Sequence, residues 1–200
     1  MTSMDLRRGN WGKFLAMLIF DTRAGYGVPS RLIHWIMAIG VLFLFGLGLW
    51  MVDLDYYSAY YTLAPHIHRS VGILLLILLV FRFGWRLVNI RPDDGDLTAF
   101  ERVAARIVHW GFYPLLLGLM VSGYLISTAD GHPIEVFDWF SVPSVYERKG
   151  LEDTAGEVHE ILAYLTIALV ALHSAAALKH HFIDRSRTLA RMWSGPPTNP

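Results

Sequence analysis

The 200-residue sequence contains no cysteine. Disulfide bonds, iron–sulfur clusters and thiolate metal sites are therefore excluded, and any metal ligands must come from the nine histidines, the carboxylates or the seven methionines. Charged residues are also scarce, at 17% of the chain against about a quarter of an average globular domain. The formal net charge is zero, which gives no support for nucleic-acid binding. Hydrophobic residues make up 54%, a balance that favours a membrane protein.

Four long apolar stretches dominate the sequence. Each is close to the ~20 residues that a helix needs to cross the hydrocarbon core of a bilayer. The predicted spans are Leu32–Val52, His68–Val88, Val108–Ile126 and Val158–Leu178. A soluble bundle of apolar helices is the alternative, but runs such as "VGILLLILLV" show no polar face. We therefore predict an all-α membrane protein, built as a bundle of four transmembrane helices.

Positive charge is distributed unevenly between the two predicted sides of the membrane. Fourteen Lys and Arg residues lie before the first span, in or beside the loop between the second and third spans, or after the fourth span. Only Arg69, Arg148 and Lys149 lie on the other side, among many acidic residues. Loops rich in Lys and Arg stay in the cytoplasm. Both termini are therefore expected to be cytoplasmic.

One membrane domain accounts for most of the chain. We expect residues 1–30 to form a cytoplasmic or interfacial arm, residues 31–192 the membrane domain, and the Pro-rich residues 193–200 a disordered tail. Within the arm, "FLAMLIF" (Phe14–Phe20) is too short to span a bilayer and has no small-residue cleavage site. It is interpreted as an interfacial segment and not as a signal peptide.

Two loops carry local signals. Before the third span, Thr98 and Glu101 have the spacing of a capping box, which predicts the start of a helix there. The loop from Ser127 to Gly156, on the side away from the termini, is long and contains turn residues and aromatics. A short surface helix is compatible with that composition.

Histidines stand out because imidazole is costly inside a bilayer and is usually functional there. His159 and His173 lie fourteen residues apart in the fourth span. In a helix this spacing places them about 21 Å apart along the axis and about 40° apart around it. The fourth span is therefore expected to present one histidine at each of two depths, on a single face.

Depth suggests a partner for each of these histidines. His34 lies at the cytoplasmic end of the first span, as His173 does in the fourth, and His68 lies at the outer end of the second span, near His159. Two histidines from different helices can bind one iron from opposite sides. Such a pair makes a six-coordinate b-type haem, which suits electron transfer because no axial position remains for a substrate. The sequence thus predicts two haems b.

Other histidines leave alternatives open. His109 matches the depth of His34 and is a rival ligand for the cytoplasmic site. His66 lies two residues from His68, on another face, and is expected to be interfacial. His132 lies in a loop and is expected to be solvated. Glycines in the first three spans leave room for a porphyrin face or for close helix contact.

Three segments resemble the bacterial cytochrome b-561 family of small di-haem, quinone-linked membrane proteins. They are "SRLIHW" in the first span, "IHRSVGILLLILLVFRFGWR" in the second and "VHEILAYLTIALVALHSAAALKHH" in the fourth. The resemblance runs from about Gly25 to Met192. It implies a multi-pass protein of the bacterial inner membrane and the pairing of His34 with His173 and of His68 with His159, and it weakens the case for His109.

The resemblance also implies an activity. Members similar to this sequence are superoxide oxidases, which take electrons from superoxide at the periplasmic face and pass them to ubiquinone near the cytoplasmic face. The matching quinone-side residue is His180, with Lys179, His181, Arg82 and Arg86 at similar depth. A histidine there can bond a quinone carbonyl and deliver a proton. It can equally be a solvated residue at a helix C-terminus.

Charge complicates the choice of electron donor. Superoxide is an anion, and a positive funnel would speed its capture. The predicted periplasmic loops are acidic, and Arg69 beside His68 is the nearest positive charge to the outer site. The alternative function is therefore a cytochrome b subunit that relays electrons between quinone and a periplasmic dehydrogenase, hydrogenase or soluble cytochrome. A proton-conducting or transporting bundle is a third hypothesis, which the paired depths and the lack of mid-span carboxylates disfavour.

Overall fold

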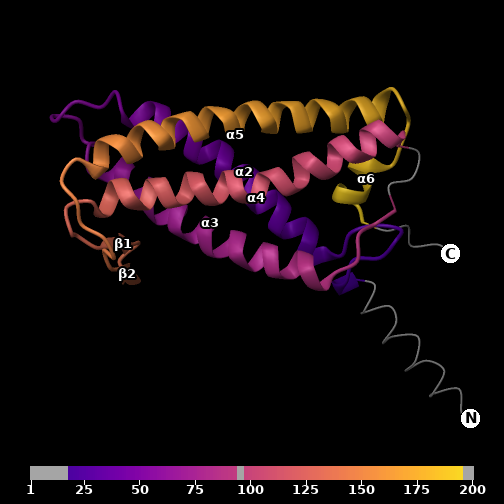
Figure 1. The fold of residues 1–200 in the computed structure, drawn as a ribbon, viewed down its shortest axis with the longest axis horizontal. Coiled ribbons are helices and arrows are strands. Elements are labelled where there is room, and N and C mark those ends of the chain that lie inside the picture. The colour runs from indigo at the N-terminus through magenta and orange to yellow at the C-terminus, as the bar shows by residue number, and fades with distance from the viewer. Residues whose placement is uncertain (1–17, 94–96, 196–200) are drawn as a thin grey trace, which may run out of the picture.

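A computed structural model gives the fold and describes residues 18–93 and 97–195. Its long helices are α2 (Val28–Met51), α3 (Leu63–Val88), α4 (Ala99–Thr128) and α5 (Leu151–Phe182). Between α4 and α5 lies an antiparallel hairpin of β1 (Ile134–Val136) and β2 (Phe140–Val142), and the short helix α6 (Thr188–Trp193) follows α5. The long helices run along one axis, with the hairpin at one end and α6 at the other (Figure 1). We call these the hairpin end and the α6 end.

Three of the long helices contain a predicted span, and α2 covers the first predicted span except for its last residue, Val52. All four are long and apolar enough to cross a membrane, which confirms the predicted fold class. Large apolar side chains face outward along them, among them Ile39 at 64% and Leu172 at 61% exposed. An apolar surface of this extent is stable against lipid and not against water. Of the segment expected at the interface, Phe14–Phe20, only residues 18–20 are described.

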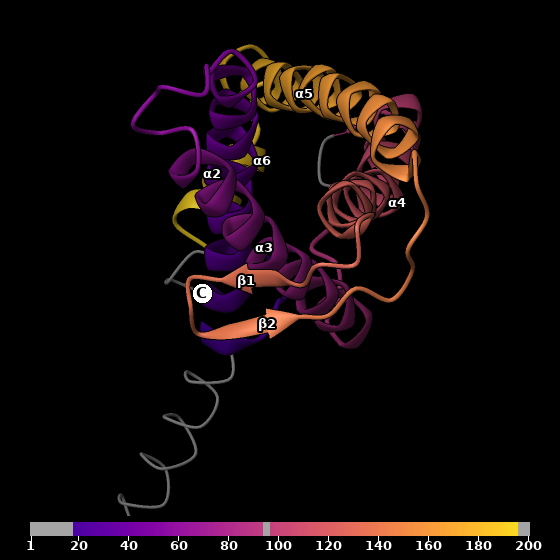
Figure 2. The same ribbon diagram turned by 90° about the vertical axis from the view of Figure 1, so that its left-hand side faces the viewer.

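The order of the helices around the bundle follows the chain. Viewed along the bundle, α2, α3, α4 and α5 form a ring (Figure 2). The backbones of α2 and α3, of α3 and α4, and of α4 and α5 pack closely, whereas α2 and α5 do not pack closely along the described residues. A core of Ile33, Met37, Leu79 and Leu116 joins α2, α3 and α4. The separation of α2 from α5 leaves room for large side chains between them.

Polar contacts close the α6 end. The Asp21 carboxylate accepts a hydrogen bond from the Gly27 amide at 2.8 Å, which fixes the turn before α2. The Trp35 indole donates to the carbonyl of Met192 at 3.1 Å, so α6 packs back onto α2. The sequence did not predict α6, which includes Trp193, the first residue of the expected tail. Residues 196–200 of that tail lie outside the described residues.

A capping box opens α4, as the sequence predicts. The Glu101 amide donates to Thr98 Oγ1 at 3.3 Å, and the Thr98 amide donates to Glu101 Oε2 at 3.0 Å. These bonds satisfy two backbone donors that a helix start leaves without partners.

The loop between α4 and α5 forms a hairpin and not the surface helix that its composition allowed; residues 129–150 are all described and contain no helix. Phe137 and Asp138 form its turn with φ of 46° and 59°, a left-handed backbone whose twist suits paired strands. Ser70 on α3 holds the hairpin, accepting from the Phe137 amide at 3.1 Å and donating to the Glu135 carbonyl at 3.3 Å. Val136 of β1 is completely buried and packs in a cluster with Ile73 of α3.

Candidate functional site

The hairpin-end histidine pair joins α3 to α5. The rings of His68 and His159 face each other with centroids 6.2 Å apart and planes inclined by 67°. Each ring lies against a glycine of a neighbouring helix. A Cβ atom added to Gly48 on α2 would stand 3.3 Å from His68 Cε1, and one added to Gly123 on α4 would stand 2.9 Å from His159 Cε1. The His159 ring therefore occupies space that a side chain at position 123 would take, and the His68 ring leaves little room for one at position 48.

Hydrogen bonds orient His159. Its Nδ1 atom lies 2.9 Å from the carbonyl oxygen of Leu119 and 3.2 Å from Oγ of Ser122. The Ser122 hydroxyl itself donates to the Leu119 carbonyl at 2.8 Å. Because a carbonyl only accepts, the network assigns the proton to Nδ1. The Nε2 lone pair of His159 is then available as a metal ligand.

The α6-end histidine pair joins α2 to α5. The rings of His34 and His173 have centroids 6.3 Å apart and planes inclined by 65°. Aromatic rings surround this pair. Trp35 lies 5.4 Å from His34, and Phe112 lies 5.7 Å from His173, measured between ring centroids. The His109 ring is closer still to His173, at 5.3 Å.

Both pairs fit a metal held between two imidazoles. With about 2 Å from the metal to each nitrogen and about 1 Å from nitrogen to ring centre, the two centroids must lie about 6 Å apart. The separations of 6.2 Å and 6.3 Å meet this requirement. The shorter distance of 5.3 Å between His109 and His173 suits two rings packed edge to face. The structure thus brings together the two pairs that the sequence predicts and places His109 beside one of them.

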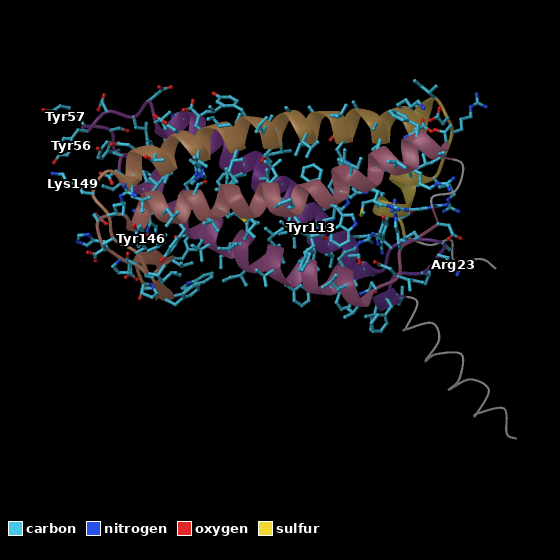
Figure 3. The ribbon with its side chains drawn as sticks, viewed as in Figure 1. Arg23, Tyr56, Tyr57, Tyr113, Tyr146 and Lys149 are labelled. Carbon is cyan, nitrogen blue, oxygen red and sulfur yellow. The ribbon has the colours of Figure 1, made fainter. Side chains whose placement is uncertain are left out.

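Arg82 on α3 approaches the α6-end pair. Its Nη2 atom lies 3.4 Å from Nδ1 of His34. Arg82 also lines a small cavity between α2, α3 and α4, together with Asp21, Tyr26, Arg86 and Tyr113 among others. Figure 3 labels Tyr113 inside the bundle. Burial raises the pKa of Tyr26, which lies before α2, so this side chain stays a neutral phenol. The cavity therefore offers guanidinium and hydroxyl donors beside a histidine of the pair.

His180 lies in a different cluster, at the end of α5. Its Nδ1 atom is 2.6 Å from a carboxylate oxygen of Asp184 and its side chain is only 12% exposed. Lys179 Nζ bridges Asp184 and Glu101 at 2.8 Å and 2.7 Å. These bonds from Lys179 and His180 hold the pKa of Asp184 below its ordinary value. Although the sequence grouped His180 with Arg82 and Arg86 by depth, no described contact joins it to either arginine.

Two further histidines lie at the hairpin end. His66 packs edge to face on Phe137 of the hairpin turn, with ring centroids 6.1 Å apart. The His132 side chain is 81% exposed and lies 3.0 Å from the carboxylate of Asp130, in agreement with the expected solvation. Neither ring faces one of the histidine pairs.

Sequence reasoning missed three groups at these sites. The Leu119 carbonyl carries no sequence signal, because every residue has one. Ser122 had a signal, since a hydroxyl inside an apolar span needs a partner. Asp184 also had one, because it stands four residues after His180, the spacing at which helical side chains meet.

A family model described as prokaryotic cytochrome b561 matches residues 25–195. The chain belongs to this family. Members bind haem b and transfer electrons in the membrane, so this protein is a multi-pass electron-transfer cytochrome of the bacterial inner membrane.

Three curated relatives extend the comparison. "Cytochrome b561 homolog 2" of Escherichia coli (strain K12) is 47% identical over 180 residues, covering 88% of this chain and 95% of its own. "Probable superoxide oxidase CybB" of Yersinia pestis is 26% identical over 166 residues, covering 80% and 90%. "Cytochrome b561 homolog 1" of Escherichia coli (strain K12) is 27% identical over 139 residues, covering 68% and 77%.

Proposed function

We propose that this cytochrome holds two haems b, one between His68 and His159 and the other between His34 and His173. The observation that supports this is the near equality of the two ring separations, 6.2 Å and 6.3 Å, each of which suits one metal between two imidazoles. When bound, each haem supplies a one-electron carrier whose axial positions are both filled. The four histidines hold the two carriers at the two depths of the bundle.

We infer that the α6 end faces the cytoplasm and the hairpin end the periplasm. Support comes from the distribution of fourteen Lys and Arg residues on the side of the termini against three on the other. Reporter fusions test this orientation. A reporter after Pro200 is expected to behave as cytoplasmic and one in the loop after α4 as periplasmic; the opposite pattern would reverse the direction of electron transfer proposed next.

The reaction that we propose is the oxidation of superoxide at the hairpin end and the reduction of ubiquinone near the α6 end. Two superoxide anions each lose one electron and become two O₂. The two electrons and two cytoplasmic protons convert one ubiquinone to ubiquinol. The relative from Yersinia pestis, whose name specifies a probable superoxide oxidase, supports this donor at 26% identity.

Two groups at the α6 end are suited to the quinone. Arg82 and Arg86 line the cavity, Arg82 also lies beside His34, and guanidinium N–H groups there can donate to a quinone oxygen. His180 is backed by the Asp184 carboxylate at 2.6 Å, an arrangement in which a carboxylate orients an imidazole that passes a proton through Nε2. We assign proton delivery to His180, and contact with the quinone oxygens to the arginines or to His180 itself.

A relay function is the second candidate. In it, a periplasmic dehydrogenase, hydrogenase or soluble cytochrome replaces superoxide as the redox partner. The acidic hairpin-end loops favour a basic protein there, since nine acidic side chains stand against Arg69, Arg148 and Lys149. Figure 3 shows Lys149 at this end among the exposed tyrosines Tyr56, Tyr57 and Tyr146.

Stopped-flow spectroscopy of the purified protein separates the two functions. Superoxide without a partner protein is expected to reduce the haems, and added ubiquinone is expected to reoxidise them. If a chemical reductant reduces the haems and superoxide does not, the relay function is favoured instead. His180→Ala is expected to keep superoxide reduction and to slow quinone turnover; unchanged turnover would remove His180 from the proton path.

A further inference from the structure

The two histidine pairs differ in what faces the nitrogen that a haem would leave free. At the hairpin end, Nδ1 of His159 donates to the Leu119 carbonyl at 2.9 Å. At the α6 end, Nδ1 of His34 faces a guanidinium nitrogen of Arg82 at 3.4 Å. One imidazole is thus polarised by a neutral acceptor and the other lies beside a full positive charge.

These surroundings act on an imidazole ligand in opposite directions. A ligand that donates its N–H to a carbonyl becomes a stronger electron donor, which stabilises the oxidised, more positive metal. A cation beside the ligand stabilises the reduced, less positive metal instead. The effect of a charge is largest where water is scarce, and a half-buried arginine within a membrane helix meets this condition.

The charge of Arg82 has no carboxylate partner in the described part of the chain, whose ion pairs lie in the loop after α4 and at the end of α5. The cavity beside it contains one further cation, Arg86, and one anion, Asp21. Asp21 directs its carboxylate to the Gly27 amide at 2.8 Å. Two guanidinium groups against one carboxylate leave this region of the bundle positive.

We propose that Arg82 raises the reduction potential of the α6-end haem above that of the hairpin-end haem. At equilibrium, an electron entering the protein therefore resides on the α6-end haem. This inference rests on the proposed pair of haems and on neither the identity of the donor nor that of the quinone. Arg82 does not bind the iron itself; its positive charge acts on the haem through the His34 ligand. It gives electron transfer from the hairpin end a downhill direction.

Potentiometric titration of the intact cytochrome tests the proposal. The wild type is expected to titrate in two components. Arg82→Gln, which removes the charge and keeps a polar side chain, is expected to shift the higher-potential component to lower potential and to leave the other component in place. Arg82→Lys keeps the charge and is expected to stay close to the wild type. Arg86→Gln removes the second charge of the same cavity and is expected to shift the same component by less, because Arg86 lies one turn further along α3 and has no described contact with His34.

A second measurement locates the electron in the half-reduced wild type, with one variant as the spectral reference. His159→Ala is expected to retain only the α6-end haem and so supplies its spectrum. In half-reduced wild-type protein, the electron is expected on the haem with that spectrum. An electron on the other haem, or an Arg82→Gln shift confined to the lower-potential component or absent from both, would overturn the proposal. A haem content other than two per chain would instead refute the proposed function on which it rests.

Discussion

The two histidine pairs have nearly the same geometry and very different surroundings. Ring separations of 6.2 Å and 6.3 Å and inclinations of 67° and 65° repeat at the hairpin end and at the α6 end. The hairpin-end rings lie against glycines and a carbonyl, whereas the α6-end rings lie among Trp35, Phe112, His109 and Arg82. Ligand geometry decides which cofactor fits. If each pair holds a haem as proposed, the neighbours would decide how that haem behaves.

The largest expected effect comes from removing a histidine of one pair. His159→Ala is expected to lose the hairpin-end haem and His173→Ala the α6-end haem, because one imidazole cannot keep a six-coordinate haem. Each variant is therefore expected to contain half of the wild-type haem. Pyridine haemochrome quantification and low-temperature spectra measure the loss. Retention of two low-spin haems in either variant would show that the pairing is wrong.

Two further histidines supply the controls. His132→Ala removes a side chain that is 81% exposed and is expected to change nothing. His109→Ala is expected to keep both haems and to alter the spectrum of the α6-end haem alone, since the ring packs 5.3 Å from His173. Loss of that haem would identify His109 as the ligand in place of His34.

Gly123 sharpens the comparison at the hairpin end. Gly123→Ala would place Cβ 2.9 Å from Cε1 of His159 and force the ring to move, and overpacking of this kind costs about 1–3 kcal/mol. The hairpin-end haem is expected to bind more weakly and the α6-end haem to be unaffected. Haem release on dilution in detergent measures the difference. Gly111→Ala on the same helix, where nothing lies within 4 Å of the added Cβ, is the matched control.

A variant of Ser70 tests whether its hydrogen bonds hold the hairpin against α3. Ser70→Ala leaves the Phe137 amide and the Glu135 carbonyl without their bonds of 3.1 Å and 3.3 Å, at a cost of about 0.5–1.5 kcal/mol for each lost bond. Hydrogen exchange in residues 134–142 is expected to accelerate. Both haems are expected to remain. Unchanged exchange would mean that burial of Val136 suffices to hold the hairpin.

The smallest expected effect comes from replacing Asp184, at the α6 end of the bundle. Its carboxylate is exposed, and bonds from Lys179 and His180 lower its pKa from 3.8. A lowered pKa in the folded state contributes stability above the ordinary value, and that stability is lost as pH falls through the lower one. Asp184→Asn is therefore expected to speed hydrogen exchange at the end of α5 at neutral pH, with no change in haem content. Below the folded-state pKa, the variant and the wild type are expected to exchange alike.

Much of this architecture could be predicted from composition and spacing. Apolar length fixed the four spans, because a bilayer sets the length of a crossing helix. The interval between His159 and His173 gave two depths on one helix face, since helical geometry is regular. The capping box at Thr98 was visible because its bonds join residues three apart. Each of these inferences uses interactions within one helix or between a helix and the membrane.

Other features escaped prediction for physical reasons. The hairpin turn is built on Phe137 and Asp138, and phenylalanine with positive φ is rare enough to hide the turn. The α6 helix has six residues, too few to show a periodic pattern, and is held by backbone carbonyls that bond Arg31 and Trp35. Depth alone also grouped His180 with the arginines, although the bundle directs it toward Asp184.

The sequence by itself determined that this protein crosses the membrane four times and carries histidines at two depths, because hydropathy and helical repeat are properties of the chain. Only the tertiary structure decided that Arg82 meets His34, 48 residues earlier, and that the Leu119 carbonyl meets His159, 40 residues later. Those contacts depend on how the helices rotate and approach one another. Rotation is set by packing across the whole bundle, and packing brings together residues that no local pattern connects.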